Sequence, residues 1–384
     1  MRFMKVSMAA IAAMGFVAGT GTAQAEGNAA DGLKAMQELN LIVLGKMTGG
    51  HDVEGKAFVG GDLTGNTPFG IGNKSQGLTP SDRPTLTVVG DATGGGSINN
   101  GWNGGAGSVA TIPGMVVGGD VTGFTLNTQN AVVKVGGKLT GTNLSEGSTV
   151  DVGGKVVGGN ANGATVNGNL GNGFAVGLLS DLGDQKSKLS QDLAALSSAL
   201  GSLATTAGSG FDFTDHNNVK MKAVAGDSGF AVINVDASDF FGNISGLSYD
   251  FTPGLTTVVN VIGAGDFIWN FNTNGNAAAY NSDIIFNFAD ATKLNLNRMV
   301  HGSVLAPFAS VINSTPIEGT LVAKTFTQGG EVHLGSFGGG ISFDEPGTPP
   351  GTVPEPATWA MLIAGFGIVG VAARRRRQPR AIAA

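Results

Sequence analysis

The residues best suited to chemistry in this chain are four histidines, and their spacing argues against a metal site. They are His51, His216, His301 and His333. None forms a His-x-x-x-His pair or has the glutamate-flanked spacing of a zinc ligand set. The sequence therefore predicts no metal and no cofactor, although two distant histidines could still meet in the fold.

Serines and paired carboxylates give equally little support for catalysis. Serines are abundant, but none lies in a Gly-x-Ser-x-Gly elbow. Asp212 with Asp215, or Asp236 with Asp239, could supply the two carboxylates of a glycoside hydrolase. Such spacings are more typical of turn and cap residues. We expect no catalytic residues and no enzyme, and a glycan-processing enzyme remains the alternative.

Charge and cysteine content narrow the possible partners. The formal net charge is −6, with 22 Lys and Arg against 28 Asp and Glu, and only 13% of residues are charged. This balance provides no basic surface for nucleic acid. The chain has no cysteine, so packing and hydrogen bonds must stabilise it wherever it resides.

The first 25 residues have the pattern of a signal peptide. Arg2 and Lys5 precede an apolar run over residues 6–17, and Ala23 and Ala25 form a small-x-small cleavage site. The apolar run is too short to span a membrane. We predict passage through the Sec translocon and cleavage by signal peptidase after Ala25.

The C-terminal end has the order of a stop-transfer signal. A Pro/Gly linker over residues 343–352 is followed by a sorting segment over residues 353–377, within which residues 357–373 are uncharged. That stretch just reaches the length of a transmembrane helix. Four arginines, Arg374, Arg375, Arg376 and Arg377, close the segment and should stay cytoplasmic, which leaves the body outside.

This tail resembles the PEP-CTERM sorting signal of Gram-negative bacteria. The residues that carry the resemblance are Pro354, Glu355, Pro356 and Trp359, with the arginines behind them. The resemblance implies recognition by a membrane exosortase and display at the cell surface or in the extracellular matrix. Residues 378–384 extend beyond the arginines and depart from the pattern. An uncut membrane anchor is the alternative.

Short apolar strands closed by glycine repeat through the first half of the body. The pattern Val-Gly-Gly-Asp/Lys-apolar-Thr-Gly begins at Val59, Val117 and Val135, with looser copies at Val89 and Val152. Steps of 17 or 18 residues suit one coil of a β-solenoid, because strands this short are stable only when coils stack. We predict an all-β fold, a parallel β-helix, with the Asp/Lys position facing solvent.

Leucine spacing predicts one inserted helix at about residues 178–206. Leu182, Leu189, Leu193, Leu196, Leu200 and Leu203 recur at helical steps. We expect this helix to pack along the flank of the solenoid, with a dimerising coiled coil as the alternative. Strand patterns resume at about residue 230 and end with a short strand at 341–343.

The body resembles the choice-of-anchor A domain of bacterial surface proteins over residues 35–342. Two groups of segments carry the resemblance. The first is residues 41–45, 52–57 and 59–62, and the closing one is residues 285–292, 302–307, 317–324 and 331–333. The resemblance implies an exported surface module and supplies no catalytic residues. The sequence thus predicts a structural or adhesive matrix protein with extracellular polysaccharide as a partner.

Glycan binding and ice binding are the remaining alternatives for the body. Thr85 and Thr87 form one Thr-x-Thr unit of the kind that flat ice-binding faces repeat, but the unit does not recur from coil to coil. A row of exposed aromatic side chains would favour glycan, and a flat threonine array would favour ice.

Overall fold

The computed structural model describes residues 27–72, 80–101 and 109–343. The described residues up to Gly340 form one compact unit. Within these ranges the chain is a solenoid of short parallel strands, which confirms the predicted fold class. One strand pair in the described part, β17 with β18, is antiparallel. Three faces surround a continuous apolar core.

Face 1 carries the main row of parallel strands. In spatial order these are β16 (Thr165–Asn167), β14 (Thr149–Val152), β12 (Val132–Val135), β9 (Gly114–Val117), β6 (Leu86–Val88), β3 (Ala57–Val59), β1 (Leu41–Val43), β29 (Leu321–Gln328), β27 (Ser303–Asn313), β24 (Ile284–Asn287), β21 (Thr257–Ile262) and β19 (Ala231–Asp236).

Face 2 lies around the next corner of each coil. Its strands are β15 (Val156–Val157), β13 (Leu139–Thr140), β10 (Val121–Thr122), β7 (Ala92–Thr93), β4 (Leu63–Thr64), β2 (Met47–Thr48), the second halves of β29 and β27, β25 (Ala291–Leu296) and β22 (Gly265–Trp269). Because β27 and β29 turn the corner, faces 1 and 2 form one 20-stranded sheet.

Face 3 is built from three smaller sheets. Their strands are β11 (Phe124–Leu126), β8 (Gly96–Ile98) and β5 (Thr67–Phe69); β26 (Val300–His301), β28 (Ile317–Glu318) and β30 (Val332–His333); and β17 (Gly210–Asp212), β18 (Val219–Lys222), β20 (Gly246–Tyr249) and β23 (Asn272–Asn274). Val53 bridges β5 and β30. Two 3-10 turns, His216–Asn218 and Ala277–Tyr280, connect strands here.

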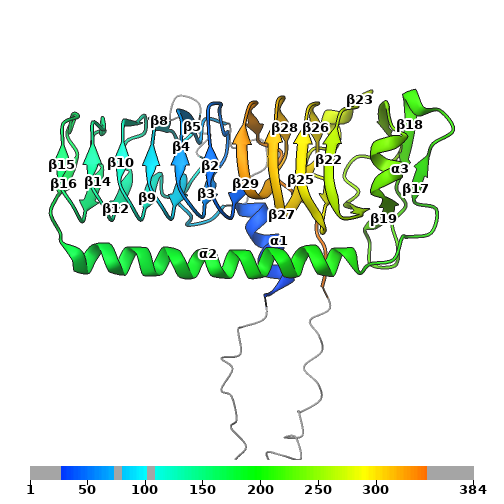
Figure 1. Ribbon diagram of the computed structural model, residues 1–384, viewed down its shortest axis with the longest axis horizontal. Helices are drawn as coiled ribbons and strands as arrows, with labels where there is room; N and C mark the ends of the chain where they lie inside the picture. The colour runs from blue at the N-terminus through cyan, green and yellow to red at the C-terminus, as the bar shows by residue number, and fades with distance from the viewer. Residues whose placement is uncertain (1–26, 73–79, 102–108, 344–384) are drawn as a thin grey trace, which may run out of the picture. The chain divides into compact units, whose positions relative to one another are not determined.

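The coils do not stack in sequence order. The first coil, with β1 and β2, lies in the middle of the solenoid, and the following coils lead away from it to β16. Helix α2 (Asn172–Gly201) then runs beside both halves (Figure 1). The remaining coils lead back from β19 until β29 pairs with β1. Thirty residues of helix span about 45 Å, enough to pass many coils.

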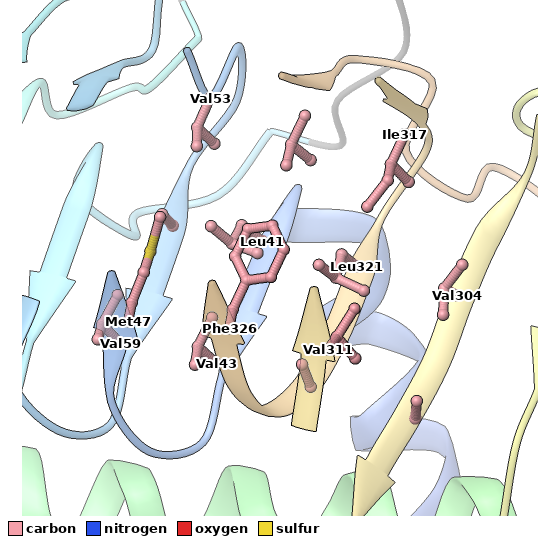
Figure 2. Close-up of a cluster of buried hydrophobic side chains, with 14 of the residues drawn as sticks. Leu41, Val43, Met47, Val53, Val59, Val304, Val311, Ile317, Leu321 and Phe326 are labelled. Atoms are coloured by element: carbon pink, nitrogen blue, oxygen red, sulfur yellow. The ribbon is translucent and has the colours of Figure 1, made fainter. Parts of the chain in front are cut away.

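The seam between the two halves is part of the hydrophobic core. Leu41 and Val43 from the first coil pack with Leu321 and Phe326 from the last, and all four side chains are buried (Figure 2). Val117, Val135 and Val152 lie in register, at the predicted steps of 18 and 17 residues. The register also shows Val88, instead of Val89, opposite Val59.

Helix α2 packs on the solenoid flank, as the leucine spacing predicts. Five of its leucines are buried: Leu182, Leu189, Leu193, Leu196 and Leu200. Its limits lie a few residues earlier than predicted. The sequence patterns gave no sign of two shorter helices, α1 (Ala29–Glu38) and α3 (Ala237–Gly242). The strand expected at 341–343 does not form, since no strand hydrogen bonds occur there.

The paired glycines of the repeat allow neighbouring coils to approach closely. A Cβ added to Gly136 would lie 2.1 Å from the carbonyl oxygen of Gly118 in the next coil. The corner that follows face 2 needs a positive φ, and Gly123 adopts φ 79°. These two requirements explain why glycine recurs at fixed positions in each coil.

The two ends of the solenoid differ. At the β19 end, Phe240 of α3 packs against Trp269, Phe271 and Phe286 and covers the core. At the other end Val156 and Val157 are exposed, with relative accessibilities of 38% and 49%. One end is therefore capped by a helix and aromatic side chains, and the other is formed by the coil of β15 and β16 itself.

Candidate binding surface

Face 2 presents one outward threonine from each of six successive coils. We call this set the threonine row: Thr140, Thr122, Thr93, Thr64, Thr48 and Thr327. Direct pairing joins Thr140 to Thr122, Thr93 to Thr64, Thr64 to Thr48, and Thr48 to Thr327. The pairing of Val121 with Ala92 puts Thr122 beside Thr93. Each row member is exposed or half-buried, and the spacing follows the strand separation of about 4.8 Å.

The residue before each threonine explains why the row points outward. Met47, Leu63, Val121 and Leu139 are buried in the core, and alternation along a strand turns the next side chain to the opposite side. The copies of the repeated motif that begin at Val59, Val89, Val117 and Val135 each supply one threonine of the row, whereas the copy at Val152 has Val157 at this position. The Thr-Gly end of the motif is therefore a sequence signal for this row as well as for the fold.

The Thr-x-Thr unit singled out in the sequence has a different role. Thr85 is fully buried and Thr87 is 6% exposed. The Thr85 hydroxyl lies 3.4 Å from the carbonyl oxygen of Asn99 and accepts from the backbone of Gly114 at 3.4 Å. These two threonines are not on an exposed face.

The charged repeat position forms a hydrogen-bonded ladder beside face 2. The backbone N–H of Asp91 donates to Asp62 Oδ1 at 3.2 Å, that of Asp120 to Asp91 Oδ1 at 2.7 Å, and that of Lys138 to Asp120 Oδ1 at 2.7 Å. These side chains are half-buried or exposed, as is Lys155. The aspartates therefore face solvent and also join one coil to the next.

A second polar group lies on face 3, where the two halves of the solenoid meet. The two ring nitrogens of His333 lie 2.6 Å from Glu318 Oε1 and 2.5 Å from Glu331 Oε2. Asn281 donates to Glu318 Oε2 at 3.1 Å, and its Oδ1 lies 2.8 Å from His301 Nδ1. Two of the four histidines thus belong to one chain of contacts that the sequence could not reveal.

The surroundings of this chain of side-chain contacts determine the charge of its two histidines. Hydrogen bonding to Glu318, and also to Glu331, raises the pKa of His333 to about 9. Burial lowers the pKa of His301. Burial also raises the pKa of the nearby Asp52, and the carboxylate of Glu331 raises it further. His333 is therefore a cation held between two carboxylates at neutral pH.

The carboxylate pairs considered for catalysis act locally. Asp212 accepts hydrogen bonds from Thr214 N–H and Oγ1 at 3.1 and 2.6 Å, and Asp215 accepts from the backbone of Asn217 at 3.0 Å. Asp236 precedes α3, and Asp239 lies in its first turn. Among the described residues, no group of three potential ligands has the geometry to hold a metal ion.

Both targeting signals lie outside the described residues. This applies to Ala23 and Ala25 at the expected cleavage site and to the whole segment 353–377 with its four arginines. In the part of the chain that is described, no helix is long and apolar enough to cross a membrane. The signal peptide and the helix at 357–373 stay predictions.

Two families match this chain. The PEP-CTERM protein-sorting motif matches residues 352–377, which confirms that resemblance and supports export to the cell surface of a Gram-negative bacterium. The family described as "Putative Ice-binding-like adhesive domain" matches residues 32–123 and 103–334. No curated protein and no solved structure matches the chain. Choice-of-anchor A membership stays a prediction. Because the second match covers most of the sequence, the chain belongs to the family of ice-binding-like adhesive domains.

Proposed function

We propose that this protein is a non-enzymatic surface adhesin that attaches to extracellular polysaccharide through face 2. The observation that carries the proposal is the threonine row on face 2, together with the burial of much of face 1. Ile42, Phe58 and Val322 point outward from face 1, yet each is at most 1% exposed. Helix α2 contacts β21, β24 and β27 on this side, and α1 packs against α2. The threonine row, by contrast, is exposed or half-buried and offers a regular surface to a ligand.

The chemistry of face 2 suits a long, uncharged, hydroxyl-rich partner. Each threonine offers a hydroxyl that donates and accepts, beside a methyl group that packs against C–H surface. The backbone of these strands is fixed by strand pairing on both sides, so the protein loses little conformational freedom when a ligand binds. A repeat along the coils matches a polymer better than a compact ligand.

The polar chain of face 3 supports a structural role over a catalytic one. Glu318 and Glu331 both engage His333, so neither carboxylate is poised as an independent acid or base. If the protein were a glycan-processing enzyme, reducing sugar ends would appear when polysaccharide is incubated with it, and Glu318→Gln would abolish their release. We expect no release from either protein.

Attachment is tested by charge placed on the threonine row. Thr48→Lys, Thr64→Lys and Thr122→Lys together put three long cations on exposed positions of face 2. The triple variant, produced in the native cells, should shift from the polysaccharide matrix fraction to the culture medium. Equal retention of variant and wild type would exclude face 2 as the attachment surface.

A matched control carries three lysines elsewhere on the same body. Thr149→Lys, Thr165→Lys and Ser187→Lys also change exposed residues, on β14, β16 and α2. This control should be retained as the wild type is. Loss of both variants from the matrix would mean that net charge, and not face 2, governs retention.

Sorting is tested separately by deleting the exosortase of the host. In the parent strain the protein should be found outside the inner membrane with the segment from about residue 357 removed. The deletion strain should hold an uncut membrane form. The same full-length mass in both strains would show that the tail is a permanent anchor.

Ice is the second candidate ligand, because the threonine row is a regular hydroxyl and methyl array on a paired sheet. The name of the family also includes ice binding. A purified protein that binds ice should be incorporated into a slowly growing ice front, and the face 2 triple variant should be excluded from it. Exclusion of the wild type would leave polysaccharide as the ligand class.

A further inference from the structure

The second half of the solenoid has a groove that is separate from the threonine row. It has a volume of about 670 Å³ and lies between the C-terminal part of α2 and the corners that join face 1 to face 2. Ser198, Gly201 and Ser202 line the helix side. Ile262, Asp290 and Phe308 line the solenoid side. A volume of this size is typical of small-ligand sites.

The floor of the groove is preorganised by a buried amide ladder. Asn287 Nδ2 donates to Ser197 O and to Asn260 Oδ1, both at 2.9 Å, and Ser197 Oγ donates to Asn287 Oδ1 at 2.6 Å. Asn260 Nδ2 in turn donates to Leu200 O at 2.8 Å. Because these amides satisfy carbonyls near the end of α2, the helix is fixed beside the corners and the groove stays open without a ligand.

The wall opposite the helix exposes two large apolar side chains. Phe308 is 52% exposed and Ile262 is 47% exposed. Phe308 lies in the corner of β27, between Ala306 and Ser310, where the pairing with β29 shifts register. An aromatic ring at such a corner has one face available, and covering that face with C–H surface would remove apolar area from water.

The polar groups of the groove favour an uncharged, hydroxyl-bearing ligand. Asp290 is exposed and offers a carboxylate, and Ser198 and Ser202 line the helix side, where the Ser202 hydroxyl donates to Ala199 O at 2.7 Å. The residues described as lining the groove include no lysine, arginine or histidine. An anionic ligand would therefore meet a carboxylate with no cation to offset it.

A peptide ligand fits this groove less well than a saccharide. Peptides that bind along a sheet pair with an unpaired strand edge. Here β24, β27 and β21 are paired on both sides, so the groove offers no free strand edge on these strands. A sugar ring needs an apolar platform and acceptors for its hydroxyls, and Phe308 and Asp290 supply both.

We propose that this groove binds a short stretch of a neutral polysaccharide, with the Phe308 ring against a sugar face and Asp290 accepting hydrogen bonds from sugar hydroxyls. The inference rests on the proposed function only for the ligand class. The site itself is independent of face 2. It would act as a second, more selective contact beside the repetitive one.

The test is a calorimetric titration of the purified full-length chain with neutral hexasaccharides of β-1,4-glucan, β-1,3-glucan and α-1,4-glucan. At least one should bind, and Phe308→Ala should weaken it about tenfold, as the loss of one aromatic contact implies. Gly201→Gln should also weaken binding by filling the groove, since a Cβ at Gly201 meets only Asn287 Nδ2, at 3.8 Å.

Two controls make the result specific. Ile268 is 52% exposed, as Phe308 is, but lies on face 2 outside the groove, so Ile268→Ala should leave the affinity unchanged. The face 2 triple lysine variant should also bind the hexasaccharide normally. Thermal melting of each variant checks that it is folded.

The remaining outcomes count against the proposal. It is overturned if none of the three hexasaccharides binds, if Phe308→Ala binds as the wild type does, or if an oligogalacturonate of equal length binds as tightly. Binding that is lost in the face 2 variant but kept in Phe308→Ala would overturn the groove and leave the proposed function standing. If instead Phe308→Ala loses binding while the face 2 variant binds normally and is also retained in the matrix, the proposed surface on face 2 is overturned and the groove stands.

Discussion

Leu41 in the first strand of the body pairs in parallel register with Leu321 in the last long strand, and both side chains are fully buried. Leu41 pairs on its other side with Ala57 of the following coil. The first coil is therefore inserted between the two halves of the solenoid, and the core is continuous only because this coil is present.

The first prediction concerns this seam. Leu41→Ala should lower the free energy of unfolding by about 2–5 kcal/mol, because it removes buried apolar volume where two halves meet. Urea unfolding followed by circular dichroism measures the change. Val157→Ala is the control: this side chain is 49% exposed, and its loss should cost less than about 0.5 kcal/mol. Equal effects would show that the seam is not tightly packed.

The second prediction concerns pH. Hydrogen bonding to Glu318 raises the folded-state pKa of His333 from its ordinary value of 6.5 to about 9, so between these pH values the folded form holds a proton that the unfolded form releases. This contribution is fully present below pH 6.5 and is lost as pH rises through 9. Stability measured by urea unfolding should decline over this window.

The decline should be absent in His333→Gln, which cannot be protonated. His216→Gln, which changes an exposed histidine on a 3-10 turn, should retain it. If His333→Gln shows the same decline as the wild type, the contacts with Glu318 and Glu331 do not favour the protonated ring.

The third prediction compares two glycines. Gly136→Ala should destabilise the protein by about 1–3 kcal/mol or more, because its Cβ would lie 2.1 Å from the carbonyl oxygen of Gly118. Gly177 lies inside α2, and a Cβ added there would meet nothing within 4 Å, so Gly177→Ala should stabilise the protein by about 0.5–1 kcal/mol. Melting temperatures should therefore move in opposite directions, and movement in the same direction would contradict the close coil contact.

The fourth prediction concerns the amide ladder under α2. Asn287→Ala leaves the buried hydroxyl of Ser197 without its acceptor and should cost about 1–3 kcal/mol. Hydrogen exchange should quicken in the C-terminal half of α2 before the rest of the body. Asn167→Ala removes an exposed contact to Asp151 and should change neither measurement. Unchanged exchange in Asn287→Ala would mean that leucine packing alone fixes the helix.

Local patterns in the sequence were sufficient for the fold class and for α2. Valine at steps of 17 or 18, glycine at the corners and leucine at helical steps each reflect a requirement within one coil or one helix. The sorting motif is likewise a linear signal, read from Pro354 to Arg377, and the family match to residues 352–377 agrees with it.

Tertiary structure alone decided which coils are neighbours and which side chains share a surface. The repeat predicts that coils stack, but it does not say which coils are neighbours, because many coils have similar sequences. The order is decided by α2, which carries the chain past the first half, and by the burial of Leu41 against Leu321, which places the first coil beside the last. Thr85 and Thr64 look alike in sequence, yet one is buried and the other exposed, because alternation is counted from an inward residue that only the register identifies. The contact of His333 with Glu318, and the groove under Phe308, arise from coil corners and stacked strands. Such sites depend on packing between segments far apart in the chain, and no local spacing encodes that packing.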